Sequence, residues 1–141
     1  MTATPYNEKT IAEFHAKRGL GIGPFGDHVL LMTAKGARSG SSITTPLVYG
    51  RNGNDYVVVA SKGGAPQNPV WFTNIQINPD VEAEVASDGG VEKFKARAHV
   101  VDDRAERDRI FQEMARIWPP YLDYQQRTER VIPVVILERE Q

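Results

Sequence analysis

The 141-residue sequence contains no cysteine, which excludes disulfide bonds, thiolate metal sites and cysteine nucleophiles. It also lacks an excess of charge, because 17 basic and 18 acidic residues leave a formal net charge of −1. Broad nucleic-acid binding needs a strong positive field, so we expect no nucleic-acid partner. No apolar run reaches the roughly 18 residues needed to span a bilayer, so we expect no integral membrane segment.

Signals for protein-based chemistry are also scarce. The three histidines, His15, His28 and His99, share no metal-ligand spacing, so no metal site is predicted. The sequence has no Gly-x-Ser-x-Gly motif, the turn that exposes a serine nucleophile in many hydrolases. Without a strong acid, base or nucleophile of its own, the chain must rely on a bound cofactor for any difficult chemistry.

The composition that remains, 40% hydrophobic and 25% charged, is typical of one globular domain covering residues 1–141. Residues 1–27 are interpreted as an N-terminal helix and a glycine-rich linker. No secretory signal is visible, which favours the cytoplasm. The N-terminal helix has a short apolar face and mixed charges, so we prefer a soluble lid, with peripheral membrane contact as an alternative.

Hydrophobic runs and turn residues predict the order helix, three strands, helix, two strands, helix, strand. Three successive strands joined by short turns imply an antiparallel meander. The fold class is therefore α+β and mainly antiparallel β, a barrel of about six strands with flanking helices. The expected helices are 7–18 capped by Asn7, 69–77 capped by Asn68, and one from Asp103 to Pro119; the expected strands are 28–33, 43–50, 55–61, 81–86, 92–101 and 131–137.

The turn Lys35–Gly40 is the first candidate site. It places two cations, Lys35 and Arg38, beside the hydroxyl of Ser39 and two glycines. Such a turn can offer backbone N–H groups and positive charge to a phosphate. An ordinary solvated hairpin turn explains the same composition.

The second candidate is the segment 60–69, where a buried strand leads through Ser61, Lys62 and two glycines into a helix. A helix N-terminus favours anions, and glycines let a ligand approach the backbone closely. The third candidate is the aromatic group Trp118, Tyr121 and Tyr124, which can line a pocket for a planar ligand. Spacing alone favours core or rim packing for these aromatics.

These motifs, in this order, resemble the deazaflavin-dependent nitroreductase family over roughly residues 28–138. The similarity rests on Gly36-Ala37-Arg38-Ser39-Gly40, Pro46-Leu47, Ser61-Lys62-Gly63-Gly64-Ala65 with Asn68-Pro69 and Trp71, and Arg130 with Ile132-Pro133-Val134-Val135. The resemblance implies a split β-barrel of the flavin-reductase type. It also implies reduced coenzyme F-420, a deazaflavin, as the donor of a hydride from carbon 5.

By the same resemblance, the Lys35–Gly40 turn and Lys62 face the phosphate and acidic tail of the cofactor. The ring-lining and other cofactor-binding positions are then Thr45, Pro46, Ala60, Ser61, Gly64, Ala65, Asn68 and Trp71. Tyr121 and Tyr124 lie on the substrate side as candidate proton donors, with Ser61 as a third. Ala37 and Ile43 stand where the family commonly has basic residues, which bears on the strength of tail binding.

The leading hypothesis is therefore an oxidoreductase that passes a hydride from reduced F-420 to a planar electron-poor acceptor, such as a quinone, an enone or a nitroaromatic. A related split-barrel enzyme that uses FMN is one alternative. A non-catalytic protein that only binds a flavin or deazaflavin is another. Either a monomer or a homodimer is compatible with the sequence.

Overall fold

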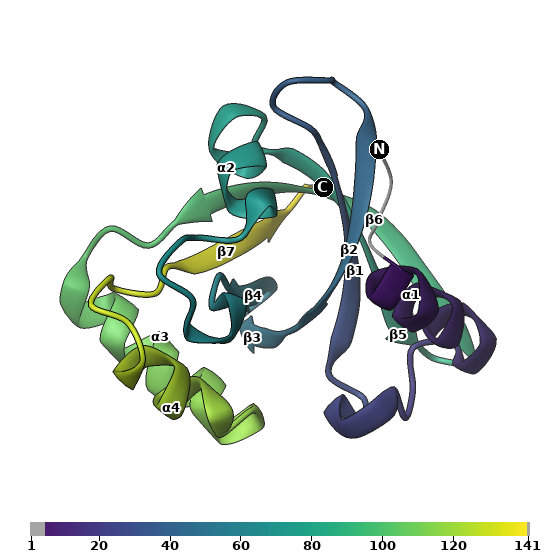
Figure 1. The fold of residues 1–141 in the computed structure, drawn as a ribbon. Coiled ribbons are helices and arrows are strands. Elements are labelled where there is room, and N and C mark those ends of the chain that lie inside the picture. The colour runs from purple at the N-terminus through teal and green to yellow at the C-terminus, as the bar shows by residue number, and fades with distance from the viewer. Residues whose placement is uncertain (1–4, 141) are drawn as a thin grey trace.

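The computed structural model describes residues 5–140, and its centre is one antiparallel sheet that curls on itself (Figure 1). Branched and aromatic residues in alternation with polar ones favour these strands, since one face of each is buried. The strands are β1 Val29–Lys35, β2 Ser42–Val48, β3 Gly50–Asn52, β4 Asp55–Val59, β5 Asp80–Ser87, β6 Gly90–Val100 and β7 Val134–Arg139.

The sheet order is β2-β1-β5-β6-β7-β4-β3, and every neighbouring pair is antiparallel. Strands β2 and β3 lie at opposite edges although only Tyr49 separates them in the chain. The sheet must therefore curl until its two edges approach each other. The Tyr49 N–H donates to the carbonyl of His28 at 2.9 Å beside this junction.

The α+β, mainly antiparallel class is confirmed, and the count of about six strands becomes seven. The predicted strand 43–50 divides at Tyr49, so its two parts belong to opposite edges of the sheet. The expected meander is correct for β1 and β2 but wrong for the third strand. Strand β4 pairs with β3 and β7 instead of β2, because the chain crosses to the other edge.

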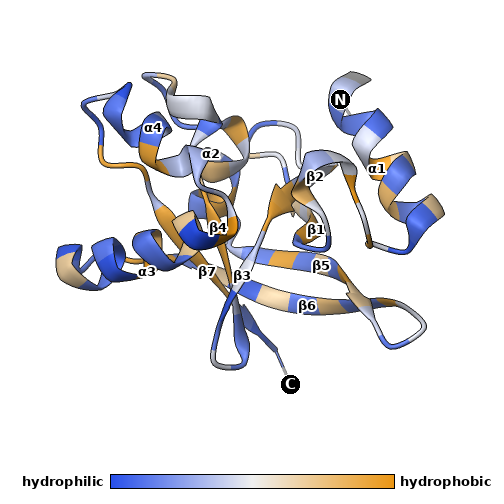
Figure 2. Ribbon diagram, turned by 90° about the horizontal axis from the view of Figure 1, so that it is seen from below, coloured by the Kyte–Doolittle hydropathy of each residue, from blue (hydrophilic) through white to orange (hydrophobic). Residues whose placement is uncertain are grey.

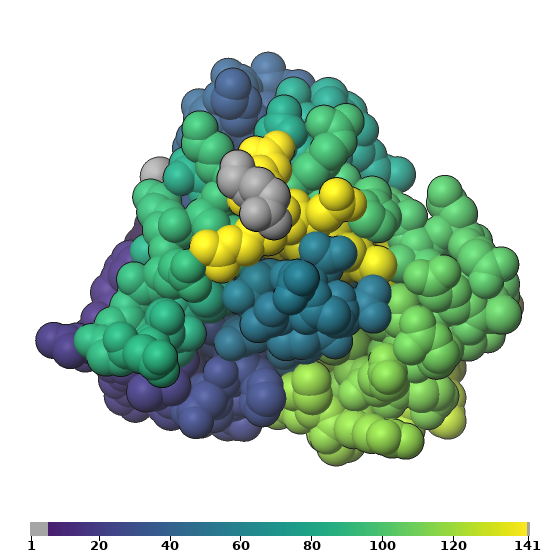
Figure 3. All heavy atoms as spheres, turned by 180° about the vertical axis from the view of Figure 1, so that it is seen from behind, coloured from purple at the N-terminus to yellow at the C-terminus, as the bar shows by residue number. Residues whose placement is uncertain are grey.

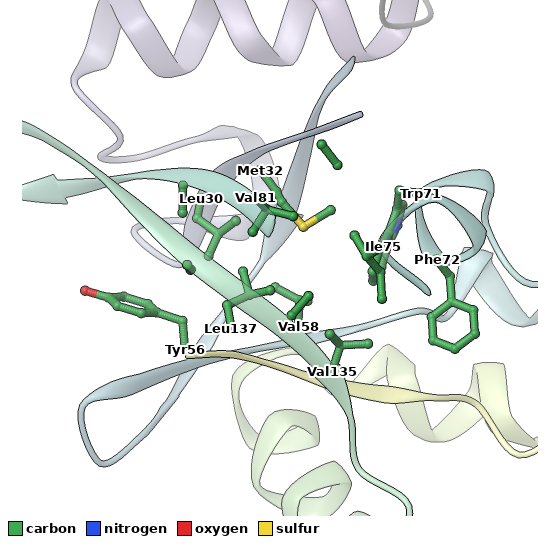
Figure 4. Close-up of a cluster of buried hydrophobic side chains, with 14 of the residues drawn as sticks. Leu30, Met32, Tyr56, Val58, Trp71, Phe72, Ile75, Val81, Val135 and Leu137 are labelled. Carbon is green, nitrogen blue, oxygen red and sulfur yellow. The ribbon is translucent and has the colours of Figure 1, made fainter. Parts of the chain in front are cut away.

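The barrel interior is filled by alternate residues of the strands and closed at one end by the helix α2 Val70–Ile77. Trp71 and Ile75 of α2 lie beside Met32 of β1 in Figure 4, and all three are buried. Figure 2 shows the matching alternation of hydrophobic and hydrophilic residues along β5. Each large side chain buried in this way contributes about 1.5–3 kcal/mol.

The remaining helices cover the outside of the barrel in two groups. The helix α1 Pro5–Lys17 packs through Phe14 against β1, and α3 Arg104–Ile117 and α4 Pro120–Gln126 pack against β4 and β7. Seen from behind in Figure 3, green α3 flanks the yellow C-terminal strand, beside the blue β3–β4 hairpin. None of the helices within residues 5–140 is long and apolar enough to cross a membrane.

The helix boundaries correct three expectations. Helix α1 begins at Pro5 and not after Asn7, since proline suits the first turn, where its missing N–H costs nothing. Asn68 does not cap α2, because its Oδ1 atom accepts a hydrogen bond from Arg130 Nη1 at 2.8 Å. No helix was predicted after Pro119, but Pro120–Gln126 forms α4 with Pro120 as its first residue. The cap at Asp103 is confirmed by a 2.9 Å bond to its Oδ2 atom from the N–H of Glu106.

Candidate functional site

A pocket of about 210 Å³ lies on the outer face of the barrel, between α1 and the α3–α4 pair. Its floor is formed by the edge strand β2 and by β4, which lies next to the opposite edge strand, where the two ends of the curled sheet approach each other. We call it the α1–α4 pocket. Its lining residues are Tyr6, Asn7, Thr10, Phe25, Val29, Pro46, Leu47, Val48, Val59, Ser61, Lys62, Gly63, Trp118, Tyr121 and Tyr124.

The pocket brings together six residues that the sequence singled out from three separate segments: Pro46, Ser61, Lys62, Trp118, Tyr121 and Tyr124. Residues paired across neighbouring strands point to the same face of a sheet. Pro46 pairs with Leu31, whose side chain packs outside the barrel beneath α1, so Pro46 also faces outward. The curl of the sheet then brings this part of β2 next to the end of β4.

One wall of the pocket is aromatic. The Trp118 Nε1–H donates to Tyr124 Oη at 3.4 Å, and the rings of Tyr121 and Tyr124 meet edge to face with centroids 6.1 Å apart. Phe25 touches Trp118 with centroids 4.8 Å apart, which joins the linker after α1 to the end of α3. Burial raises the pKa of the Tyr121 phenol well above its ordinary value, so this group stays protonated in neutral solution.

The loop after β4 has an unusual backbone. The residues Lys62, Gly63 and Gly64 form a short 3-10 turn, and all three have positive φ, with Lys62 at +47°. A non-glycine residue in this region costs of order 1–3 kcal/mol and persists only where its surroundings hold it. The Lys62 side chain is exposed, and its ammonium group has no ion pair within residues 5–140. The loop thus presents one uncompensated positive charge at the edge of the pocket.

The two glycines of this loop have different surroundings. A Cβ atom on Gly64 would lie 2.6 Å from the carbonyl oxygen of Tyr124 and 3.0 Å from Arg127 Cβ, whereas a Cβ atom on Gly63 would meet nothing within 4 Å. Gly64 was predicted to bind cofactor because glycine permits close approach of a ligand. In the structure its bare backbone permits close approach of α4, and Gly63 is the glycine that lines the pocket.

This contrast gives a stability prediction. We expect Gly64→Ala to destabilise the protein by at least about 2 kcal/mol, since it adds a backbone clash to the cost of a left-handed alanine. Gly63→Ala carries only the conformational cost, about 1–2 kcal/mol. Urea unfolding of both variants measures the difference, and equal midpoints would show that α4 does not press on Gly64.

The 35–41 turn is held by hydrogen bonds of its backbone N–H groups. Gly36 N–H donates to the Ser41 carbonyl at 2.8 Å, Ser39 Oγ accepts from the Ser41 N–H at 3.1 Å, and the N–H of Ala37 donates to Asn74 Oδ1 on α2 at 2.9 Å. Ser39 is therefore engaged within the turn. The Arg38 side chain is exposed and has no ion pair with any described residue.

Several predicted residues lie outside the α1–α4 pocket. Lys35 borders a separate hollow that contains Asp80, Glu82 and Lys95. The side chains of Ala60 and Trp71 are buried in the barrel core, and Thr45 pairs with core residue Met32 and shares its inward face. The rest of the predicted set lies in the two loops and does not line the pocket. These residues are Arg38, Ser39, Gly40, Gly64, Ala65 and Asn68.

Sequence reasoning expected the N-terminal helix to be a lid but named none of its pocket residues, and it quoted Arg130 as part of a motif without giving it a role. Tyr6, Asn7 and Thr10 of α1 form the wall opposite the tyrosines, and Phe25 closes one end. A lone aromatic residue inside the glycine-rich linker was the available signal for Phe25. Arg130 binds the 60–68 loop through four hydrogen bonds, and nothing in its local sequence indicates partners more than 60 residues away.

Comparison with known proteins gives a consistent result. A family model described as F-420H(2)-dependent quinone reductase matches residues 7–139. The F-420H(2)-dependent quinone reductase Rv1261c of Mycobacterium tuberculosis is 39% identical over 118 residues, covering 78% of this chain and 72% of that protein. Among solved structures, an F-420-H2 dependent reductase (FDR-A) is 34% identical with a TM-score of 0.69, covering 79% of this chain and 94% of that chain. A chain described as a domain-swapped dimer is 31% identical with a TM-score of 0.71, covering 94% of this chain and 96% of that one.

Proposed function

The chain belongs to the F-420H(2)-dependent quinone reductase family, and from that membership we propose that its α1–α4 pocket holds the reacting ends of reduced coenzyme F-420 and of a quinone-type acceptor. When bound, the cofactor supplies the hydride. The protein is then an oxidoreductase whose own residues bind, orient and protonate. The observation that carries the proposal is a pocket with an apolar floor, an aromatic wall and an unpaired lysine at its edge.

The residues present fit such a cofactor. Pro46 and Val59 offer an apolar floor to a planar ring, and Ser61 adds a hydroxyl at the end of β4. Lys62 at the pocket edge and Arg38 outside the pocket are exposed cations without ion pairs among residues 5–140. The Lys62 loop leads into α2, and the Arg38 turn is bonded to α2 through Asn74. Unpaired cations beside an apolar pocket suit a ligand that has a planar ring and an anionic tail.

The acceptor is proposed to lie between α1 and the tyrosines. This part of the pocket has Tyr6, Trp118 and Tyr124 on its walls, and aromatic walls favour a flat, electron-poor ring. Thr10 and Asn7 add polar groups that can contact ring oxygens. Helix α1 therefore acts as one side of the acceptor site.

A cofactor and substrate panel tests the proposal. Purified protein is assayed with reduced F-420 against quinones, enones and nitroaromatics, and in parallel with reduced FMN. Oxidation of reduced F-420 that depends on a quinone, with little turnover of FMN, is the expected result. Turnover with FMN alone would replace the cofactor, and tight F-420 binding without oxidation by any acceptor would indicate a binding protein.

A charge variant tests the tail site. We expect Arg38→Ala to weaken F-420 binding about tenfold, the size of one charged hydrogen bond at about 1.5 kcal/mol. Because Arg38 is exposed, the loss should shrink as ionic strength rises and screening grows. Fluorescence titration at low and high salt measures it, with the exposed Arg116→Ala on α3 as the matched control. Equal affinities for Arg38→Ala and wild type at low salt would remove the turn from the site.

A second charge variant tests the pocket edge. We expect Lys62→Ala to raise the Michaelis constant for reduced F-420 about tenfold, since the ammonium group has no other partner to stabilise. The thermal midpoint should not fall, because the side chain makes no ion pair in the described chain and alanine carries no larger backbone strain. Loss of cooperative folding would instead identify a structural lysine.

A further inference from the structure

Arg130 makes an unusually complete set of contacts with the 60–68 loop. Its Nε atom donates to the Ala65 carbonyl at 2.9 Å, Nη2 to the Ser61 carbonyl at 2.7 Å, and Nη1 to the Ala60 carbonyl at 3.2 Å and Asn68 Oδ1 at 2.8 Å. One guanidinium thus joins both ends of the loop. Arg130 itself does not line the α1–α4 pocket.

The contacts fix the direction of the loop's peptide groups. In a trans peptide the C=O of one residue and the N–H of the next point in opposite directions. The carbonyls of Ala60 and Ser61 point to Arg130, so the N–H groups of Ser61 and Lys62 point away from it. Ser61, Lys62 and Gly63 are the loop residues that line the pocket.

The loop needs such an anchor because its backbone is strained at Lys62, whose φ is +47°. Without the guanidinium, the Ala60 and Ala65 carbonyls and Asn68 Oδ1 would lose this partner, while the Ser61 carbonyl would keep only the Gly64 N–H at 2.9 Å. The left-handed run 62–64 would then be restrained by its own short-range backbone hydrogen bonds and by packing alone. Packing of Gly64 on α4 would remain. The expected consequence is a shifted or mobile loop on an intact barrel.

Arg130 is itself held in place from the other side. Its carbonyl accepts from Gln125 Nε2 at 2.8 Å, and its N–H donates to Thr128 Oγ1 at 3.3 Å. The geometry requires an arginine, since a lysine has one nitrogen and cannot reach acceptors spread over a planar fork. Partial burial lowers the pKa of Arg130, which remains charged because an arginine pKa lies far above neutral pH.

We propose that Arg130 is a positioning residue for cofactor binding, which acts by holding Ser61 and Lys62 in the conformation that faces the pocket. The inference rests on the proposed function. It separates the roles of the two cations: Lys62 contacts the ligand, and Arg130 shapes the loop that carries Lys62.

The test compares Arg130→Lys with Arg116→Lys, an exposed arginine on α3 that serves as the matched control. We expect Arg130→Lys to weaken F-420 binding about tenfold to a hundredfold, the range of one or two charged hydrogen bonds. Turnover at saturating cofactor should change less than about threefold, because binding energy restores the loop once the ligand is present. Hydrogen exchange of the free protein should be faster at residues 61–65 and unchanged in the barrel strands.

Each outcome decides a separate question. If wild type does not bind F-420, the proposed function fails, and the exchange data still show whether Arg130 holds the loop. Unchanged exchange at 61–65, or faster exchange with wild-type affinity, overturns the positioning role. If both Arg130→Lys and Arg130→Gln lose cooperative unfolding by circular dichroism, Arg130 supports the whole fold and the inference is wrong.

Discussion

Arg107→Ala is expected to lower the free energy of unfolding by about 3–5 kcal/mol, the largest stability effect of any single arginine in residues 5–140. The side chain is only 6% exposed on the inner face of α3. Its Nε and Nη2 atoms donate to the Ile132 carbonyl at 3.0 and 2.8 Å, and Nη2 also donates to Gln125 Oε1 at 2.7 Å. Removing it leaves the buried Ile132 carbonyl without this partner, and Gln125 Oε1 keeps only the Ile132 N–H. A buried acceptor left unsatisfied costs more than the bond itself contributes.

The effect should also reach the loop that Arg130 holds. Gln125 accepts from Arg107 and from the Ile132 N–H, and it donates to the Arg130 carbonyl. Arg107 therefore fixes the segment between α4 and β7 that carries Arg130. The guanidinium lies 4.2 Å above the Phe111 ring, so alanine removes packing as well as charge.

Arg104→Ala is the matched control on the same helix. Arg104 pairs with Asp108 at 2.9 Å, but its side chain is exposed. The loss of this side chain should therefore change the free energy of unfolding by less than about 0.5 kcal/mol. Denaturant unfolding of both variants measures the contrast, and Arg107→Ala should lower the thermal midpoint by about 10 °C or more. A difference below about 1 kcal/mol between the two variants would show that the buried network is not essential.

Local sequence signals were sufficient for much of the fold. The alternation in 81–86 and 92–101 predicted β5 and β6 to within one or two residues at each end, and the Asp103 cap was predicted correctly. These features depend on neighbours within a few residues. Strand pairing does not: nothing around Tyr49 indicates that β2 and β3 belong to opposite edges of the sheet.

The same limit applies to the site. Resemblance to a family indicated Pro46, Ser61, Lys62, Tyr121 and Tyr124, and all five line one pocket. Asn68 looked like a helix cap because its local context fits one, but a partner 62 residues away competes successfully for its side chain. A cap bond from a neutral backbone N–H is weaker than a bond from a guanidinium, and only the tertiary structure reveals which is formed.

The largest catalytic effect is expected from Tyr124→Phe. Hydride transfer to a quinone places negative charge on its oxygen, and a donor aimed at that oxygen stabilises the transition state. Tyr124 lines the pocket, and its oxygen accepts from Trp118 Nε1–H at 3.4 Å. With that lone pair occupied, the phenolic hydrogen is free to donate elsewhere. Such a donor can also act as a general acid.

Tyr121 has a different environment. Its side chain is 4% exposed, it packs on Phe111 with centroids 6.1 Å apart, and burial raises its pKa. A raised phenol pKa favours the neutral form in the folded protein, so the stability it contributes is present below pH about 10 and is lost as the pH rises further. A phenol held neutral in this way is a weaker proton donor than an accessible one. The structure therefore favours Tyr124 over Tyr121 as the donor, and Ser61 is the third candidate donor on the pocket wall.

We expect Tyr124→Phe to lower the turnover number about tenfold to a hundredfold while F-420 affinity stays within about twofold. Tyr121→Phe is the matched control, since it removes the neighbouring hydroxyl and keeps the ring, and it should cost less than Tyr124→Phe. Trp118→Phe removes the N–H that orients Tyr124 together with part of the aromatic wall, and its effect on turnover should lie between those of the two tyrosine variants. These values come from steady-state kinetics with several quinones. If Tyr124→Phe, Tyr121→Phe and Ser61→Ala all keep full turnover, none of these three hydroxyls donates the proton, and solvent or another group must supply it after hydride transfer.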